Sequence, residues 1–380
     1  HSYLDNPTFR GMRQCLMNTF DEIYVLDLHG NAKKRERVPE EVRETEGISD
    51  KDENVFDIQQ GVAISFFIKH SGHKGKTAVY HADLWGTRDR KYDWLQKHNI
   101  ENTNWQEITP TSPSYLFVPE DKSLWKVYRS FASVCDIFPV NSVGIVTARD
   151  RLTIHWTPEN VWSTVVAFAS MDPELARKGY KLGNKVSIAR IKEAQEDIKR
   201  TGPSKENIVP ILYRPFDVRY TYYTGRANGF HERPRPQVMR HMLAGENLAL
   251  CVVRQVKTSQ QWQHCFVTDH VVEACVVSNR TSEIGYVFPL YEYMRSGSLV
   301  DKGREPNLKQ ELVDTLVAAY GRAPSPEEIF HYIYAVLYTP SYRERYAEFL
   351  RRDFPRIPFT GDQRVFKEMA ALGKRLVDLH

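Results

Sequence analysis

Apolar and polar positions divide the first ninety residues into one predicted helix and three predicted strands. The helix has apolar side chains at intervals of three or four residues, at Phe9, Met12, Leu16 and Phe20. Thr8 precedes this pattern and is expected to cap the helix. β-branched and aromatic residues then dominate residues 22–30, 61–69 and 76–86, which predicts strands.

Between the first two strands, residues 31–54 are charged and polar without an apolar period, which predicts a solvated surface loop. Residues 187–200 carry apolar positions on one helical face and stop before Gly202, which predicts an amphipathic helix.

The C-terminal part is predicted to be helical. Ser325 and Glu328 are spaced as a capping box, with Pro326 at the first helical position. Ser341 is expected to cap the helix that follows, and a last helix is expected over residues 363–379. We expect these helices to pack together as a support layer.

Composition excludes several classes of protein. The 380 residues are 41% hydrophobic and 26% charged, and they contain no apolar run long enough to cross a membrane. The five cysteines form no C-x-x-C pair, which argues against a disulfide framework and a zinc site, so we predict no metal and a reducing cytoplasm. With a net charge of only +4, any nucleic-acid signal has to be local.

Residues 211–262 contain that local signal. Eight basic residues stand against three acidic ones there, an excess of five positive charges, and tyrosines are interleaved among them. Arginine and lysine neutralise phosphates, arginine binds guanine with two hydrogen bonds, and glutamine does the same with adenine. The loop residues 224–236 and the run 254–262 are too rich in glycine, proline or polar residues to be core. The predicted DNA-contacting residues are Arg226, His231, Arg233, Arg235, Arg240, Arg254, Gln255, Lys257, Gln260 and Gln261.

Two alternatives stay open for this segment. Its arginines can instead pair with acidic residues elsewhere in the chain, while its tyrosines line an ordinary β core. The segment can also bind acidic proteins, which would make the chain a protein-interaction scaffold. DNA affinity that falls steeply with salt separates DNA binding from both.

The opening residues contain Asn6-Pro7-Thr8-Phe9, one residue away from the N-P-P-[YF] loop of enzymes that methylate an amine on a DNA base. That loop has to leave the end of a buried strand beside the cofactor, and only five residues precede Asn6. We therefore interpret Asn6-Pro7 as a turn that enters the helix. Asp27 and His29 could do acid-base work at a strand end, but a structural role is favoured, and no catalytic residue is assigned.

Several long blocks carry a resemblance to a known family. They include "SYLDNPTFRGMRQCLMNTFDEIYVLDLHGN", "GVAISFFIK", "YRPFDVRYTYYTG", "RPRPQVMRHML" and "IFHYIYAVLYTPSYRERYAEFLRRDFPRIP". In this order they resemble the C-terminal part of type ISP restriction-modification enzymes and related adenine-N6 DNA methyltransferases. In that family one polypeptide carries a nuclease, a helicase-like ATPase, a methyltransferase and a target-recognition domain.

The resemblance implies a fold, a domain division and a set of partners. The implied fold class is α/β, in which residues 1–165 would be the distal part of a Rossmann-like class I methyltransferase sheet. Residues 166–380 would be a mixed α+β target-recognition (specificity) domain that ends in helices over 325–380. The implied partners are double-stranded DNA and the upstream methyltransferase, ATPase and nuclease domains, with no membrane involved. S-adenosyl-L-methionine would be bound mainly by upstream residues, and ATP and Mg²⁺ would serve only the upstream domains.

Because residue 1 is His rather than Met, we expect the chain to be a piece of a longer prokaryotic cytoplasmic enzyme, with the catalytic loop upstream of His1. The intact enzyme would methylate adenine N6, and this piece would recognise the DNA sequence but would be inactive alone. A non-catalytic specificity subunit that works with a separate methyltransferase chain is the alternative.

Overall fold

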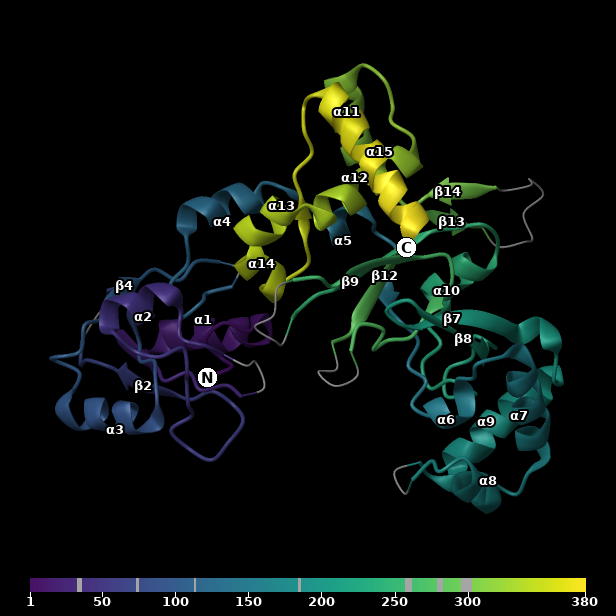
Figure 1. The fold of residues 1–380 in the computed structure, drawn as a ribbon, viewed down its shortest axis with the longest axis horizontal. Coiled ribbons are helices and arrows are strands. Elements are labelled where there is room, and N and C mark those ends of the chain that lie inside the picture. The colour runs from purple at the N-terminus through teal and green to yellow at the C-terminus, as the bar shows by residue number, and fades with distance from the viewer. Residues whose placement is uncertain are drawn as a thin grey trace. The chain divides into compact units, whose positions relative to one another are not determined.

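The computed structural model describes residues 1–32, 36–72, 75–112, 114–183, 186–256, 262–278, 283–294 and 303–380. These residues form a mixed α/β structure of several small sheets and many short helices (Figure 1). They fall into two compact units. The first contains His1–Val127 with short later segments that include Arg351–Asp353, and the second contains nearly all of the rest.

The first unit is built on a four-stranded sheet with the order β2-β1-β3-β4. The strands are β1 (Glu22–Asp27), β2 (Ala63–Ile68), β3 (Ala78–Asp83) and β4 (Gln106–Ile108). β1 and β3 run parallel, whereas β2 and β4 are antiparallel to their neighbours. In this register Ile23 lies opposite Val79 of β3 and Phe67 of β2. The side chains of Ile23 and Val79 are fully buried or nearly so. The three strands predicted from the sequence are confirmed.

Helices of the first unit are η1 (Pro7–Phe9), α1 (Arg10–Thr19), α2 (Glu40–Glu46), α3 (Arg88–Lys97) and, at its limit, α4 (Lys122–Arg129). The predicted first helix is confirmed, but its predicted cap is wrong. Phe9 occupies the cap position of α1 without a side-chain hydrogen bond. Asn6 Oδ1 instead accepts a hydrogen bond from the Thr8 N–H at 2.9 Å, which closes the turn before the helix. The interpretation of Asn6-Pro7 as a helix-entry turn agrees with this geometry.

The polar stretch 31–54 is not simply a solvated loop, so that prediction is wrong. It contains helix α2, and Val38 and Asn54 are buried. The carboxylate of Asp52 is fully buried beside Lys91 of α3. An ion pair and hydrogen bonds to backbone groups fix this segment within the first unit. Such contacts leave no periodic apolar pattern in the sequence.

The second unit contains two larger sheets. One has the order β10-β9-β12-β6 and the other the order β11-β7-β8. Their strands are β6 (Ser142–Val143), β7 (Ile208–Arg214), β8 (Asp217–Tyr222), β9 (Ala249–Val253), β10 (Cys265–Thr268), β11 (Val271–Val272) and β12 (Gly285–Pro289). The pairs β13 (Tyr291–Tyr293) with β14 (Arg304–Pro306) and β15 (Arg356–Ile357) with β5 (Ala132–Ser133) form small ribbons.

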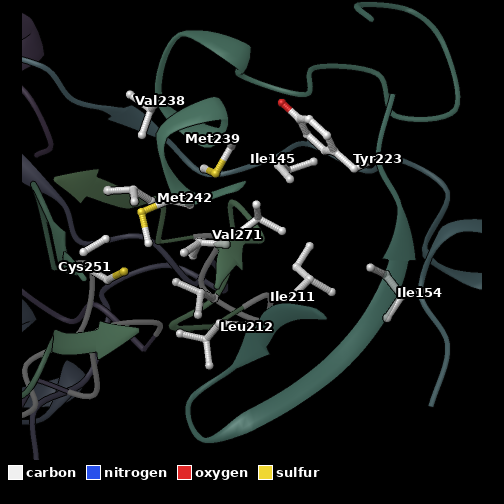
Figure 2. Packing of buried hydrophobic residues seen from close by; sticks show 14 residues of the cluster. Ile145, Ile154, Ile211, Leu212, Tyr223, Val238, Met239, Met242, Cys251 and Val271 are labelled. Atoms are coloured by element: carbon white, nitrogen blue, oxygen red, sulfur yellow. The ribbon is translucent and has the colours of Figure 1, made fainter. Parts of the chain in front are cut away.

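A buried apolar cluster lies where these sheets meet helix α10 (Pro236–Leu243). Figure 2 shows Met239 and Met242 of α10 facing Ile211 and Leu212 of β7 and Val271 of β11. A second cluster joins β8 to helices α7 (Pro158–Ser170), α8 (Pro173–Gly179) and α9 (Ile188–Thr201). Shorter helices of this unit are α5 (Val134–Ile137), α6 (Asp150–Thr153) and η2 (Lys205–Asn207).

The predicted division at residues 165/166 falls inside α7, whereas the compact units divide between residues 127 and 128. The assignment of residues 128–165 to a methyltransferase part therefore stays a prediction.

The C-terminal helices are α11 (Gln310–Tyr320), α12 (Pro326–Tyr338), α13 (Pro340–Arg345), α14 (Ala347–Arg352) and α15 (Gln363–Leu379). The capping box at α12 is confirmed: Glu328 N–H donates to Ser325 Oγ at 3.1 Å, and Ser325 N–H donates back to Glu328 Oε2 at 2.9 Å. Ser341 does not cap a helix as predicted, because Pro340 already occupies the first position of α13. None of the described helices is long and apolar enough to cross a membrane.

α12 and α15 pack closely, in agreement with the predicted support layer, and Gly373 permits their approach. A Cβ atom on Gly373 would lie 1.8 Å from the backbone oxygen of His331. We expect Gly373→Ala to lower the free energy of unfolding by about 1–3 kcal/mol, since the two helices have to move apart. Gly361→Ala is the control, because a Cβ there meets nothing within 4 Å. Equal urea midpoints for the two variants would contradict this expectation.

Candidate nucleic-acid interface

The strongest candidate surface follows strand β8 and continues into helix α10. Here the chain forms loop 223–235, and Arg233 pairs with Val146 through two backbone hydrogen bonds of 3.0 and 3.1 Å. Tyr223 Oη donates to the Pro234 backbone oxygen at 3.0 Å. The loop is therefore fixed to the second unit at its C-terminal end.

The predicted DNA-contacting residues divide into three groups by exposure. Arg226, Arg233 and Arg240 are exposed. Arg235, Arg254 and Gln255 are partly buried. Burial and the neighbouring Arg233 lower the pKa of the Arg235 guanidinium. Lys257, Gln260 and Gln261 lie outside the described residues.

His231 is placed in the interior and leaves the candidate surface. Its side chain is 1% exposed and lies 2.8 Å, through Nε2, from Thr221 Oγ1. The Thr221 hydroxyl donates its hydrogen to the Thr153 backbone oxygen, so the imidazole has to be the donor through Nε2. Burial lowers the pKa of His231 to about 3, and this side chain is neutral.

The buried imidazole of His231 predicts a pH-dependent stability. Because the folded pKa of about 3 lies below the ordinary 6.5, the unfolded chain binds more protons in between. We expect this residue's contribution to be complete above pH 6.5 and to fall by about 2 kcal/mol between pH 6.5 and 5. Urea unfolding of the wild type and His231→Gln at both pH values measures it. Parallel pH profiles of the two proteins would contradict the assignment.

Two other arginines of the basic segment take part in internal interactions. Arg214 Nη1 lies 2.7 Å from Glu273 Oε2, and burial raises the pKa of that carboxyl to about 7. Arg219 binds Asp217 at 2.8 Å and stacks on Trp156, with 3.9 Å between the guanidinium carbon and the ring centre. For these two arginines, the alternative that the basic segment pairs with acidic residues is confirmed.

In the first unit, His29 lies between two carboxylates at the ends of the parallel strands β1 and β3. His29 Nε2 is 2.8 Å from Asp83 Oδ1, and its Nδ1 is 3.8 Å from Asp27 Oδ1. Burial raises the pKa of Asp83, but hydrogen bonds with His29 and His81 outweigh it and hold this pKa below its ordinary value. Potential ligand atoms of Asp27, His29 and Asp83 lie within 4.8 Å of one another, so the absence of a metal stays a prediction.

Several residues of the candidate surface were missed from the sequence. Asn228 is exposed beside Arg226 at the tip of the loop, and its N-G dipeptide is a turn signal that could have drawn attention to it. Arg149 and Asp197 are buried residues that form hydrogen bonds with this loop. They come from distant parts of the chain, so the sequence around the loop gives no signal of them.

The second unit is therefore a mixed α/β domain that exposes arginines on a loop. The sequence model described as the Type ISP C-terminal specificity domain matches residues 136–380, and the chain belongs to this family. The resemblance to type ISP restriction-modification enzymes is thereby confirmed. No curated protein matches the chain.

Three solved structures are similar over the whole of this chain. The cryo-electron microscopy structure of a DrdV–DNA complex is 27% identical with a TM-score of 0.71. A nuclease-deletion mutant of the Type ISP restriction-modification enzyme LlaGI, in complex with a DNA substrate mimic, is 22% identical with a TM-score of 0.68. The ATP-dependent Type ISP restriction-modification enzyme LlaBIII, bound to DNA, is 20% identical with a TM-score of 0.70. This chain covers 37%, 34% and 25% of those chains, respectively.

Proposed function

We propose that this chain supplies DNA target recognition to a Type ISP restriction-modification enzyme. The observation that carries the proposal is the exposed arginine set, Arg226, Arg233 and Arg240, on a loop and helix inside the region that matches the specificity domain. Exposed guanidinium groups on a fixed framework can neutralise phosphates and read guanine edges. The DNA in the similar DrdV complex supports DNA as the partner, and we propose that this DNA is double-stranded.

For the first unit we propose the distal part of a class I methyltransferase sheet. Its parallel pair β1 and β3 with an antiparallel edge strand β2 suits a doubly wound α/β fold. Strand β2 reads AISFFI, yet none of its residues is buried and Phe66 is 45% exposed. An apolar edge strand that is this exposed suits pairing with a further strand of the enzyme.

S-adenosyl-L-methionine is the methyl donor that we propose for the whole enzyme. The sequence of this chain contains no G-x-G on a strand-to-helix turn, the element that would be expected to hold the cofactor. The residues present therefore do not fit a complete cofactor site, and we derive no methyl-transfer step from them. Transfer to adenine N6 and the cofactor site belong, in this proposal, to other parts of the enzyme.

Two assays test these proposals separately. In the first, residues 1–380 are incubated with a library of random double-stranded DNA, and we expect enrichment of one defined DNA sequence, the selected word. Absence of any enriched word would contradict target recognition. In the second, the chain is mixed with labelled S-adenosyl-L-methionine and the enriched DNA. Turnover by this chain alone would contradict the placement of the methyl-transfer site elsewhere.

A further inference from the structure

The loop that follows β8 ends in a tight, exposed turn. Arg226, Ala227 and Asn228 are all exposed. Gly225 and Asn228 have φ angles of 74° and 59°, and the Asn228 N–H donates to the Glu232 backbone oxygen at 2.9 Å. Asparagine tolerates this left-handed conformation better than most residues do. The turn therefore presents one arginine and one asparagine two positions apart.

A buried carboxylate from α9 clamps both sides of this turn. Asp197 is 3% exposed, and its Oδ2 accepts hydrogen bonds from Thr224 Oγ1 at 2.7 Å and from the Phe230 N–H at 2.8 Å. A Cβ atom on Gly229 would lie 2.1 Å from the same oxygen. Glycine is required at position 229 because the backbone passes so close to the carboxylate.

A buried guanidinium holds the same segment through its carbonyl groups. Arg149 is 6% exposed, and its Nη2 donates to the Gly229 and Phe230 backbone oxygens at 2.6 and 3.1 Å. Its Nη1 donates to the Arg190 backbone oxygen on α9 at 3.2 Å. Burying two ionised side chains beneath one surface turn is costly. A merely connecting loop would not require it.

We propose that the turn 226–228 reads base edges in DNA, and that Arg149 and Asp197 are positioning residues that hold it in one conformation. Arg226 suits the acceptors of guanine, and Asn228 suits the donor and acceptor of adenine. Rigid support from a buried layer keeps such side chains within the narrow range of geometry that base discrimination needs. The inference rests on the proposed DNA recognition, and it adds the reading residues and their support.

The test measures discrimination rather than affinity alone. The wild-type chain first selects its word from a random double-stranded library, and binding is then measured for that word and for each single-base change. We expect Asn228→Ala to reduce discrimination at one position by about 5- to 150-fold. Arg149→Lys and Asp197→Asn keep both turn side chains but weaken the clamp. We expect both to reduce discrimination at the positions read by the turn, with binding to unrelated DNA unchanged.

Gln195→Ala is the matched control for lost stability. Gln195 lies two residues from Asp197 on α9, is 5% exposed, and donates to the Phe168 and Met171 backbone oxygens at the C-terminal end of α7 rather than to the turn. Its loss lowers stability without moving the turn, so discrimination should stay at the wild-type value. If the wild type selects no word, the proposed function and this inference both fail. The wild type can instead select a DNA sequence. If Arg149→Lys and Asp197→Asn then discriminate that sequence from its single-base changes as well as the wild type does, only the inference is overturned.

Discussion

Asp52→Ala is expected to destabilise the first unit by about 3–5 kcal/mol, because it leaves a buried ammonium group without the carboxylate that balances its charge. Lys91 and Asp52 both have fully buried side chains, and Lys91 Nζ lies 2.6 Å from Asp52 Oδ1. The same carboxylate accepts hydrogen bonds from the Gly30 and Gly86 N–H groups at 2.6 and 3.0 Å. One side chain therefore connects the loops that follow β1 and β3 to helix α3.

Chemical denaturation followed by tryptophan fluorescence measures this effect, since Trp85, Trp94 and Trp105 lie in the first unit. Asp50→Ala is the control, because the side chain of Asp50 is 53% exposed and pairs with Arg37 at the surface. The double variant Asp52→Leu/Lys91→Met removes both charges and should lose less stability than Asp52→Ala. If Asp52→Ala and Asp50→Ala unfold at the same denaturant concentration, the buried pair does not have the role assigned to it.

Local signals in the sequence predicted the elements that depend on local interactions. The capping box at Ser325 and the helix over residues 363–379 match the structure, because caps and apolar periodicity act within a few residues. The role of Asp52 could not be predicted in this way. Its partners, Gly30, Gly86 and Lys91, lie 22 to 39 positions away, and a carboxylate in a charged stretch is typical of a solvated surface.

The candidate surface was predictable to the same limited extent. Glycine and proline around Arg226 and Arg233 indicated a surface loop, and the structure exposes both arginines. His231 lies in that loop yet is buried, because residues 229–231 pass through the interior between exposed Asn228 and exposed Arg233. Arg149 and Asp197 reach the loop from 80 and 33 positions away. Sequence composition identifies a basic loop, whereas only the fold determines which of its side chains can meet a ligand.

The triple variant Arg226→Ala/Arg233→Ala/Arg240→Ala is expected to lose most of the DNA affinity while keeping its stability. All three side chains are exposed, and the hydrogen bond to a buried group that the variant removes, from Arg240 Nε to His241 Nε2, is long at 3.3 Å, so stability should fall little. Each phosphate contact contributes about 0.9 to the slope of log affinity against log salt, which corresponds to about eightfold in affinity between 1 M and 0.1 M salt. If all three contact phosphates, the slope falls by about 2.7 and the affinity at 0.1 M salt falls by roughly 500-fold.

Fluorescence anisotropy with a labelled duplex at several salt concentrations measures both quantities. The matched control, Arg177→Ala/Arg364→Ala/Lys374→Ala, removes the same charge from ion pairs of the second unit in which Arg364 and Lys374 are exposed and Arg177 is partly buried. If affinity depends on the position of the arginines, the control keeps nearly the wild-type slope. Equal losses in the two triple variants would mean that net charge alone attracts DNA, and the loop-helix surface would lose its assignment as the interface.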